Sequence, residues 1–268
     1  MIRQPKAAGT FYPAEETQLR KQLRELIKES PKKESAVGIV SPHAGYVFSG
    51  RIAGRCFAQV NLTKTVIVLG PNHTGLGAPF SIMAEDAQWQ MPLGIVPVDC
   101  HLVQQILAGS KHLKNDSQAH LYEHSIEVQL PFLQYILPRV QIVPIILAHA
   151  DFDTYDEIGE SIAEAVEKNG RKCLIIASSD MSHYEPEEQA RAKDKTAIEA
   201  ILNLDARELL QRIDKSHISM CGYGAVAVML SAAKRLKACR ARLLQYQTSG
   251  DVTGDYSSVV GYAGILVQ

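Results

Sequence analysis

The sequence contains few cysteines, and none of them forms a paired motif. Five cysteines are spread over 268 residues, and no two are arranged as CxxC. An odd number of dispersed cysteines is typical of reduced thiols rather than of a disulfide framework. Because reduced thiols persist in the cytoplasm, we expect a cytoplasmic protein.

Long apolar runs and an excess of one charge are also missing. No run approaches the roughly 18 apolar residues that a membrane span needs, and residues 1–13 lack the apolar stretch of a signal peptide. The 28 Lys and Arg residues and 29 Asp and Glu residues give a net charge of −1. We therefore expect neither a nucleic-acid partner nor a membrane partner. A hydrophobic content of 46% excludes disorder as the main state.

The sequence does contain an alternation of short apolar runs and helical stretches. The runs that we interpret as strands are 36–41, 65–70, 141–148, 172–177, 242–247 and 257–267. Helical periodicity predicts helices over 14–29, 50–60, 100–108 (capped by Asp99), 125–137, 154–168, 187–203, 205–213 and 222–237, and we expect a hairpin within 78–98. Continuous apolarity indicates strands that are covered on both faces. The pattern predicts an α/β fold: a single-domain α/β/α sandwich over 1–268 with a mostly parallel sheet.

Polar residues follow the predicted strands at their carboxyl ends. His43 follows 36–41, His73 follows 65–70, Asp180 and His183 follow 172–177, and Asp251 follows 242–247. A further group, Glu123-His124-Ser125, stands where the 125–137 helix should begin. Ligands of open α/β sheets bind beyond the carboxyl ends of the strands. We therefore expect these residues to form one polar site.

Imidazole and carboxylate groups without paired thiolates suit a transition-metal ion. Two histidines and one carboxylate from separate loops are the ligand set of a non-haem Fe(II) site, and His43, His73 and Asp251 supply that set. Asp180, His183 and His124 would then serve as catalytic groups in proton transfer. The sequence alone leaves open which of these groups would bind the metal directly.

Two other residues lie outside this set of candidate ligands and catalytic groups. Cys221 precedes the predicted 222–237 helix, whose N-terminus would lower the pKa of a thiol, so it is the one candidate reactive cysteine. His149 also follows a strand, but we assign it no role. Phosphate-loop motifs such as GxxxxGK[ST] are absent from the sequence.

Several motifs together resemble the Memo family, whose microbial members are often called protein B of the AmmeMemoRadiSam system. The resemblance covers nearly the whole chain. The motifs that carry it are Ala8-Gly9-Thr10-Phe11-Tyr12-Pro13, Ser41-Pro42-His43-Ala44-Gly45-Tyr46, Gly70-Pro71-Asn72-His73, Glu123-His124-Ser125-Ile126-Glu127, Ser178-Ser179-Asp180-Met181-Ser182-His183 and Ser257-Ser258-Val259.

The resemblance implies a fold similar to that of class III extradiol dioxygenases and a metal pocket at the residues matching His43 and His73. Animal members have a cysteine as the third group and are described as binding copper or iron. Alignment through Gln247-Thr248-Ser249-Gly250-Asp251 places Asp251 on that cysteine. A carboxylate is a harder ligand than a thiolate, so we expect a divalent metal ion, with Fe(II) favoured over Cu or Zn.

Three functions follow as hypotheses. The first is a metal-dependent, dioxygenase-like oxidoreductase that acts on an unknown small-molecule substrate. The second is a non-catalytic partner- or peptide-binding protein, and the third is a metal-dependent hydrolase that uses a metal-bound water. The system name implies a radical SAM enzyme and an Amme-type domain protein as partners. Fold alone does not decide among these hypotheses.

Overall fold

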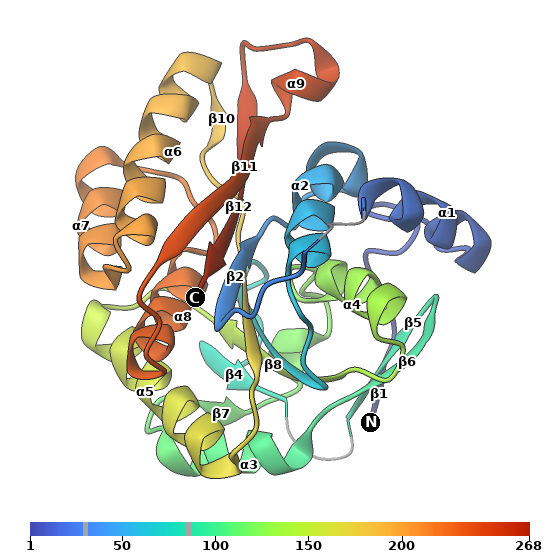
Figure 1. The fold of residues 1–268 in the computed structure, drawn as a ribbon, viewed down its shortest axis with the longest axis vertical. Coiled ribbons are helices and arrows are strands. Elements are labelled where there is room, and N and C mark those ends of the chain that lie inside the picture. The colour runs from blue at the N-terminus through green and yellow to red at the C-terminus, as the bar shows by residue number, and fades with distance from the viewer. Residues whose placement is uncertain (29–31, 84–86) are drawn as a thin grey trace.

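The computed structural model describes residues 1–28, 32–83 and 87–268, and one large sheet forms its centre (Figure 1). Four parallel strands lie in the middle, in the order β2 (Gly38–Ser41), β9 (Leu174–Ser178), β3 (Thr65–Pro71) and β8 (Gln141–Leu147). All residues of β2, β9 and β3 are buried, as their continuous apolar sequences predict.

On both sides of this parallel centre, the next strand pairs antiparallel with it. On one side, β12 (Val259–Val267) pairs with β2 and also with β10 (His183–Glu185) and β11 (Ala241–Thr248). On the other side, β4 (Phe80–Ile82) pairs with β8, and β7 (Lys114–Asn115) pairs with β4. The parallel part of the sheet is therefore its buried centre, where every strand ends at the same edge.

Helices cover both faces of the sheet, which confirms the predicted α/β sandwich (Figure 1). One face carries α1 (Glu16–Leu26), α2 (Tyr46–Gln59) and α4 (Leu130–Ile136). The other carries α3 (Cys100–Gly109), α5 (Phe152–Asn169), α6 (Glu187–Leu202), α7 (Ala206–Ser216) and α8 (Tyr223–Arg235). Among the described residues, no helix is both long and apolar enough to cross a membrane.

The predicted helix over 125–137 has two parts, because Pro131 fits only the first turn of a helix. A 3₁₀ turn at Glu127–Gln129 precedes α4, in which Pro131 is the second residue. Asp99 caps α3, as predicted, by accepting a hydrogen bond from the backbone N of Leu102 at 3.1 Å. Position 29 of the predicted first helix lies outside the described residues.

A second, small sheet ties the N-terminus to the molecule. It consists of β1 (Ile2–Arg3), β5 (Gln88–Met91) and β6 (Gly94–Pro97), and the antiparallel pair β5–β6 is the hairpin expected within 78–98. Positions 84–86 of that range lie outside the described residues. The buried Arg3 guanidinium donates to Glu127 Oε2 at 2.7 Å, which fixes the segment that follows Glu123 and His124.

Candidate metal centre

The carboxyl ends of the parallel strands bring several of the predicted residues to one cavity. His43 follows β2, His73 follows β3, and Asp180 follows β9. A cavity of ≈ 680 Å³ at this edge is lined by these three residues together with His124 and His183. Phe11, Phe48, Tyr184 and Tyr262 form aromatic parts of its wall. The structure therefore brings His43, His73, His124, Asp180 and His183 together at one cavity.

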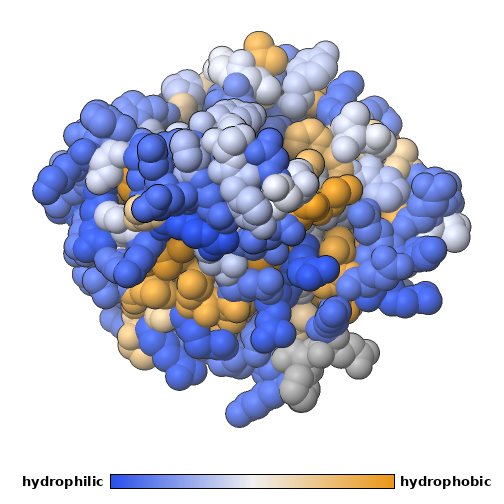
Figure 2. All heavy atoms as spheres, turned by 90° about the horizontal axis from the view of Figure 1, so that it is seen from above, coloured by the Kyte–Doolittle hydropathy of each residue, from blue (hydrophilic) through white to orange (hydrophobic). Residues whose placement is uncertain are grey.

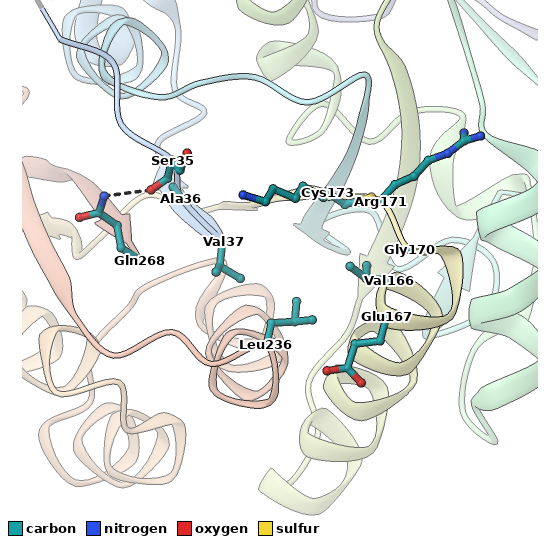
Figure 3. A pocket seen from close by; sticks show the side chains of 11 residues that line it. Ser35, Ala36, Val37, Val166, Glu167, Gly170, Arg171, Cys173, Leu236 and Gln268 are labelled. Atoms are coloured by element: carbon teal, nitrogen blue, oxygen red, sulfur yellow. Dashed lines mark hydrogen bonds between the residues drawn. The ribbon is translucent and has the colours of Figure 1, made fainter.

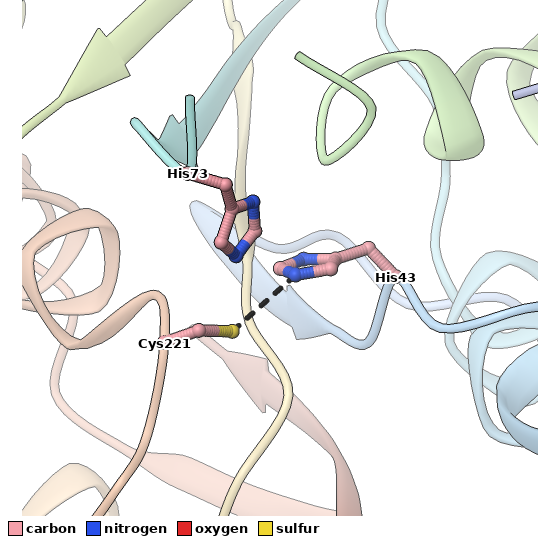
Figure 4. Close-up of side chains that lie close together, drawn as sticks. All are labelled: His43, His73 and Cys221. Carbon is pink, nitrogen blue, oxygen red and sulfur yellow. Dashed lines mark hydrogen bonds between the residues drawn. The ribbon is translucent and has the colours of Figure 1, made fainter. Parts of the chain in front are cut away.

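Among the described residues, three groups of side chains have metal-ligand spacing, and one of them consists of His43, His73 and Cys221 (Figure 4). One ligand atom from each lies within 4.8 Å of the others. The Sγ atom of Cys221 lies 3.3 Å from Nε2 of His43, and the His43 and His73 ring centroids are 5.2 Å apart. Two imidazole nitrogens and one sulfur are ligands that zinc, copper and iron accept, so the donor set fits a transition-metal ion.

Each of the two histidines is anchored through the nitrogen that faces away from Cys221. Nδ1 of His43 lies 3.0 Å from Ser178 Oγ, and Nδ1 of His73 lies 2.9 Å from Glu123 Oε1. Metal-binding histidines commonly use the second ring nitrogen in this way, which fixes the orientation of the ring. The anchoring therefore supports the fit of the site to a metal ion.

The electrostatics of the two rings differ. Burial lowers the pKa of His43 well below its usual 6.5, and the neighbouring His73 and His124 lower it further. Burial also lowers the pKa of His73, but the hydrogen bond and charge of Glu123 outweigh it, so that pKa is raised. His43 is therefore held as a neutral imidazole, whereas His73 keeps its proton more readily than an ordinary histidine when no metal is bound.

Asp180, His183 and Cys221 form a second such group, and one ligand atom from each of the three lies within 4.8 Å of the others. Asp180 Oδ1 accepts hydrogen bonds from the backbone N of His43 at 2.8 Å and of Ala44 at 3.3 Å. Burial raises the pKa of Asp180. Nδ1 of His183 lies 2.8 Å from the carbonyl oxygen of Ser219, which leaves its Nε2 available.

His124 packs between the cavity and the N-terminal segment. Its ring stacks on that of His73 with centroids 4.9 Å apart, and the ring of Phe11 lies at 4.6 Å. Burial lowers the pKa of His124, although the charge of Glu123 acts in the opposite direction. His124 therefore contributes a neutral aromatic wall to the cavity.

Asp251 does not reach this centre, so the predicted ligand set requires a correction. Asp251 lies on the short helix α9 (Gly250–Thr253), where its Oδ2 accepts from the backbone N of Thr248 at 2.8 Å and lies 3.4 Å from Arg191 Nη2. Within the described residues, no group with metal-ligand spacing contains Asp251. A carboxylate after Gly250 is here the cap of a turn. Cys221 replaces it as the third candidate ligand.

Cys221 also differs from the sequence-based expectation in its acidity. We expected the following helix to lower the pKa of the thiol, but burial and then the nearby Asp180 raise it. Gly222 allows the close approach that buries the sulfur, because a Cβ atom there would collide with the Ser178 carbonyl and the Ser179 side chain. The Met220-Cys221-Gly222 sequence before a helix was the signal that could have identified this residue.

Two of the further cavities contain residues that the sequence analysis or the fold singles out. One of ≈ 460 Å³, at the amino ends of β2 and β9, is lined by Val37, Val166, Leu236 and Cys173, with the charged Glu167 and Arg171 nearby (Figure 3). His149, to which no role was assigned, is exposed, hydrogen-bonds to the Tyr223 hydroxyl and lines another cavity. Neither cavity is lined by a group of side chains with metal-ligand spacing among the described residues.

Comparisons with known proteins agree with the motifs. A family model described as Memo-like protein matches residues 3–266. MEMO1 family proteins of Methanosarcina barkeri and Archaeoglobus fulgidus are each 45% identical to this chain, with 100% of both chains covered. That of Methanocaldococcus jannaschii is 43% identical over 100% of this chain and 99% of its own. The crystal structure of an uncharacterized protein from Escherichia coli K12 shares the fold at 12% identity, with a TM-score of 0.59, and covers 85% of this chain and 98% of its own.

Proposed function

The chain belongs to the Memo family, and we propose that it holds a divalent metal ion between His43, His73 and Cys221 and acts as an oxidoreductase on a small molecule. The observation that carries the proposal is the convergence of two anchored imidazoles and one sulfur on a single point of the cavity. The preference for Fe(II) depended on a carboxylate ligand. With sulfur in that place, copper and zinc fit as well as iron.

The protein's own groups supply the remaining requirements of such a reaction. When bound, the ion supplies Lewis acidity and, in the case of iron or copper, electron transfer. His183, whose Nδ1 is bonded to the Ser219 carbonyl, presents Nε2 as a proton acceptor or donor. Asp180 is positioned by the His43 and Ala44 backbone to accept or hold a proton beside it.

The cavity suits a flat, partly apolar substrate. Phe11, Phe48 and Tyr262 line it, and the stacked His124 and His73 rings continue the aromatic surface. Such walls exclude water from one side of a ring-shaped molecule, while Asp180 and His183 contact its polar groups. We therefore propose an aromatic or dihydroxylated small molecule as the substrate class.

Metal content and dioxygen uptake test this proposal together. Protein purified without oxygen and without a chelating tag is expected to carry a near-stoichiometric transition metal and to consume dioxygen with a catechol present. His43→Ala should lose the metal, whereas His183→Ala should keep it and lose the uptake. The exposed His101 on α3 provides a matched control, because His101→Ala leaves the cavity intact. Equal metal content in His43→Ala and wild type would contradict the proposed site.

The rim of the cavity favours partner binding as a second candidate function. Tyr184 lines the cavity and is 79% exposed, and its φ of 58° lies in the left-handed region, which bulky L residues adopt at a cost. Val47 and Tyr256 are also exposed and neighbour cavity-lining residues in sequence. The face seen from above, which carries α9, is mainly hydrophilic with separate apolar areas (Figure 2). Tyr184, exposed at the cavity in a costly backbone conformation, is the observation that favours a binding surface here.

We propose a radical SAM enzyme or an Amme-type domain protein as the partner at this rim. Titration calorimetry with each purified candidate partner tests this role directly. Binding that Tyr184→Ser abolishes and His183→Ala preserves supports docking at the rim. An affinity that is equal for wild type and Tyr184→Ser would place the partner elsewhere.

A further inference from the structure

A chain of buried hydrogen bonds lies behind His43 and joins Ser178, which anchors its ring, to Gln129, to which the proposed function gives no role. Ser178 Oγ lies 3.0 Å from His43 Nδ1, 2.8 Å from Gln129 Nε2 and 2.7 Å from the carbonyl oxygen of Ser125. Ser178, Gln129 and Ser125 are fully buried and His43 almost fully. Each polar atom of this chain must therefore find its partner within the protein.

The orientation of the Gln129 amide follows from its neighbours. Its Nε2 lies 2.9 Å from the carbonyl oxygen of Pro42, which can only accept a hydrogen bond, and its Oε1 accepts from Ser41 Oγ at 2.8 Å. A flipped amide would place two oxygens against each other at Pro42. Nε2 is thus the atom that faces Ser178, and it donates to Ser178 Oγ.

The single hydrogen of the Ser178 hydroxyl then has one place to go. The Ser125 carbonyl only accepts, so without that hydrogen two oxygens would face each other at 2.7 Å. Gln129 Nε2 only donates, so it cannot take the hydrogen. The hydroxyl therefore donates to Ser125 and presents a lone pair to Nδ1 of His43.

We infer that Ser178, held in place by Gln129, is a positioning residue that keeps His43 as its Nδ1–H tautomer and leaves Nε2 free to bind a metal ion. The neutral ring carries one hydrogen, so a hydrogen on Nδ1 leaves the lone pair on Nε2, which faces Cys221 Sγ at 3.3 Å. The purpose of this arrangement rests on the proposed function, in which a metal ion takes the lone pair that the Cys221 thiol faces in the metal-free protein.

His73 provides an internal reference, because a different group holds it. Its Nδ1 is bonded to the Glu123 carboxylate and not to the chain of Gln129 and Ser178. Changes at Ser178 or Gln129 should therefore alter the tautomer of His43 and leave the His73 resonances in place. A general loss of folding would disturb both rings, so the two roles can be separated in one spectrum.

The test is ¹⁵N NMR of histidine-labelled protein from which metal has been removed by a chelator. In wild type, His43 should show the Nδ1–H tautomer, in Ser178→Ala a mixture with the Nε2–H tautomer, and in Gln129→Met a smaller shift in the same direction. Gln134→Met is the matched control, because Gln134 is also a buried glutamine of this helical region but bonds to the Gly94 carbonyl. The inference would be overturned if His43 carried its hydrogen on Nε2 in wild type. It would also be overturned if the tautomer ratio of His43 in Ser178→Ala equalled that in wild type. An unchanged ratio in Gln129→Met would overturn the role given to Gln129.

A second measurement separates this inference from the proposed function. Zn(II) titration should show an affinity about 10- to 100-fold lower in Ser178→Ala than in wild type, the range typical for loss of a group that orients a metal ligand. If wild type binds no metal and the tautomer still changes in Ser178→Ala, the proposed function fails while the positioning role stands. If metal binds and its affinity is equal in both proteins, the positioning role fails while the proposed function stands.

Discussion

Glu123 holds His73 with both of its carboxylate oxygens. Oε1 lies 2.9 Å from Nδ1 of the His73 ring, and Oε2 accepts from the His73 backbone N at 2.8 Å. The carboxylate is fully buried, whereas 31% of the His73 side chain is exposed to the cavity. The buried Glu123 carboxylate thus fixes the orientation of the partly exposed His73 ring. Nε2 of that ring faces His43 and Cys221.

Replacing this carboxylate by an amide should weaken metal binding. In Glu123→Gln the side chain keeps its size but loses its charge. Its NH₂ group then faces an N–H group of His73, so one of the two hydrogen bonds between the residues is lost. We expect the affinity for Zn(II) to fall by about 10- to 100-fold. Titration with a competing chelator measures the change, and Glu167→Gln, at an exposed site far from the cavity, serves as the control. An affinity equal to that of wild type would contradict the role of Glu123.

The same pair should give metal-free protein a pH-dependent stability. Burial raises the pKa of Glu123, but the hydrogen bond and charge of His73 outweigh it and lower the pKa from 4.5 to about 2. Glu123 therefore stabilises the fold above pH 4.5, and that contribution is lost as the pH falls towards 2. The raised pKa of His73 adds stability below pH 6.5, which is lost as the pH rises through that pKa.

The free energy of unfolding should therefore differ most between wild type and Glu123→Gln from pH 4.5 to 6.5. Urea denaturation at about pH 3, 5.5 and 8.5 measures the difference, which should be smaller at both extremes. A difference that does not vary with pH would show that the loss is one of packing rather than of charge.

Arg3 and Glu127 form a fully buried ion pair, and removal of one partner should be costly. Arg3→Ala leaves the Glu127 carboxylate buried, with Tyr12 and two backbone N–H groups as its remaining donors. We expect roughly 3–5 kcal/mol of lost stability, the range for breaking a buried pair. Arg20→Ala is the control, because the Arg20–Glu16 pair is exposed. Urea denaturation that shows equal stability for the two variants would contradict this account.

Tyr184 should be important for binding rather than for folding. Its φ of 58° is energetically unfavourable for a tyrosine but not for a glycine, and 79% of the residue is exposed. Tyr184→Gly should therefore leave the thermal midpoint unchanged or raise it, while the binding of an aromatic substrate or a partner weakens. A large fall in the thermal midpoint would show that Tyr184 is a structural residue.

The elements and most of the site were predictable because they depend on local patterns. Continuous apolar runs identified the buried strands, and polar residues directly after them identified His43, His73 and Asp180 as neighbours. Parallel strands end at one edge of a sheet, so sequence distance did not matter for these residues. The short strand β10 and the short helix α9 were not predicted, because neither has a hydrophobic period of its own.

Cys221 and Asp251 show the limit of such reasoning. Both stand beside a glycine close to a regular element, so each resembles a residue that is presented at a turn. Which one reaches the cavity depends on how α8 and α9 are placed against the sheet, and long-range packing decides that placement. The anchoring of His43 by Ser178 and Gln129 could not be predicted either, because it depends on the directions of two buried side chains, which no local pattern in the sequence sets.

The third ligand is tested most directly by titrating wild type, Cys221→Ser and Asp251→Asn with Zn(II) and Cu(I) under anaerobic conditions. We predict that Cys221→Ser loses affinity for both ions, more strongly for Cu(I), because oxygen replaces a soft sulfur ligand. Asp251→Asn should bind like wild type, because asparagine also caps the turn at Thr248. Wild-type affinity in Cys221→Ser together with loss of binding in Asp251→Asn would contradict the proposed centre.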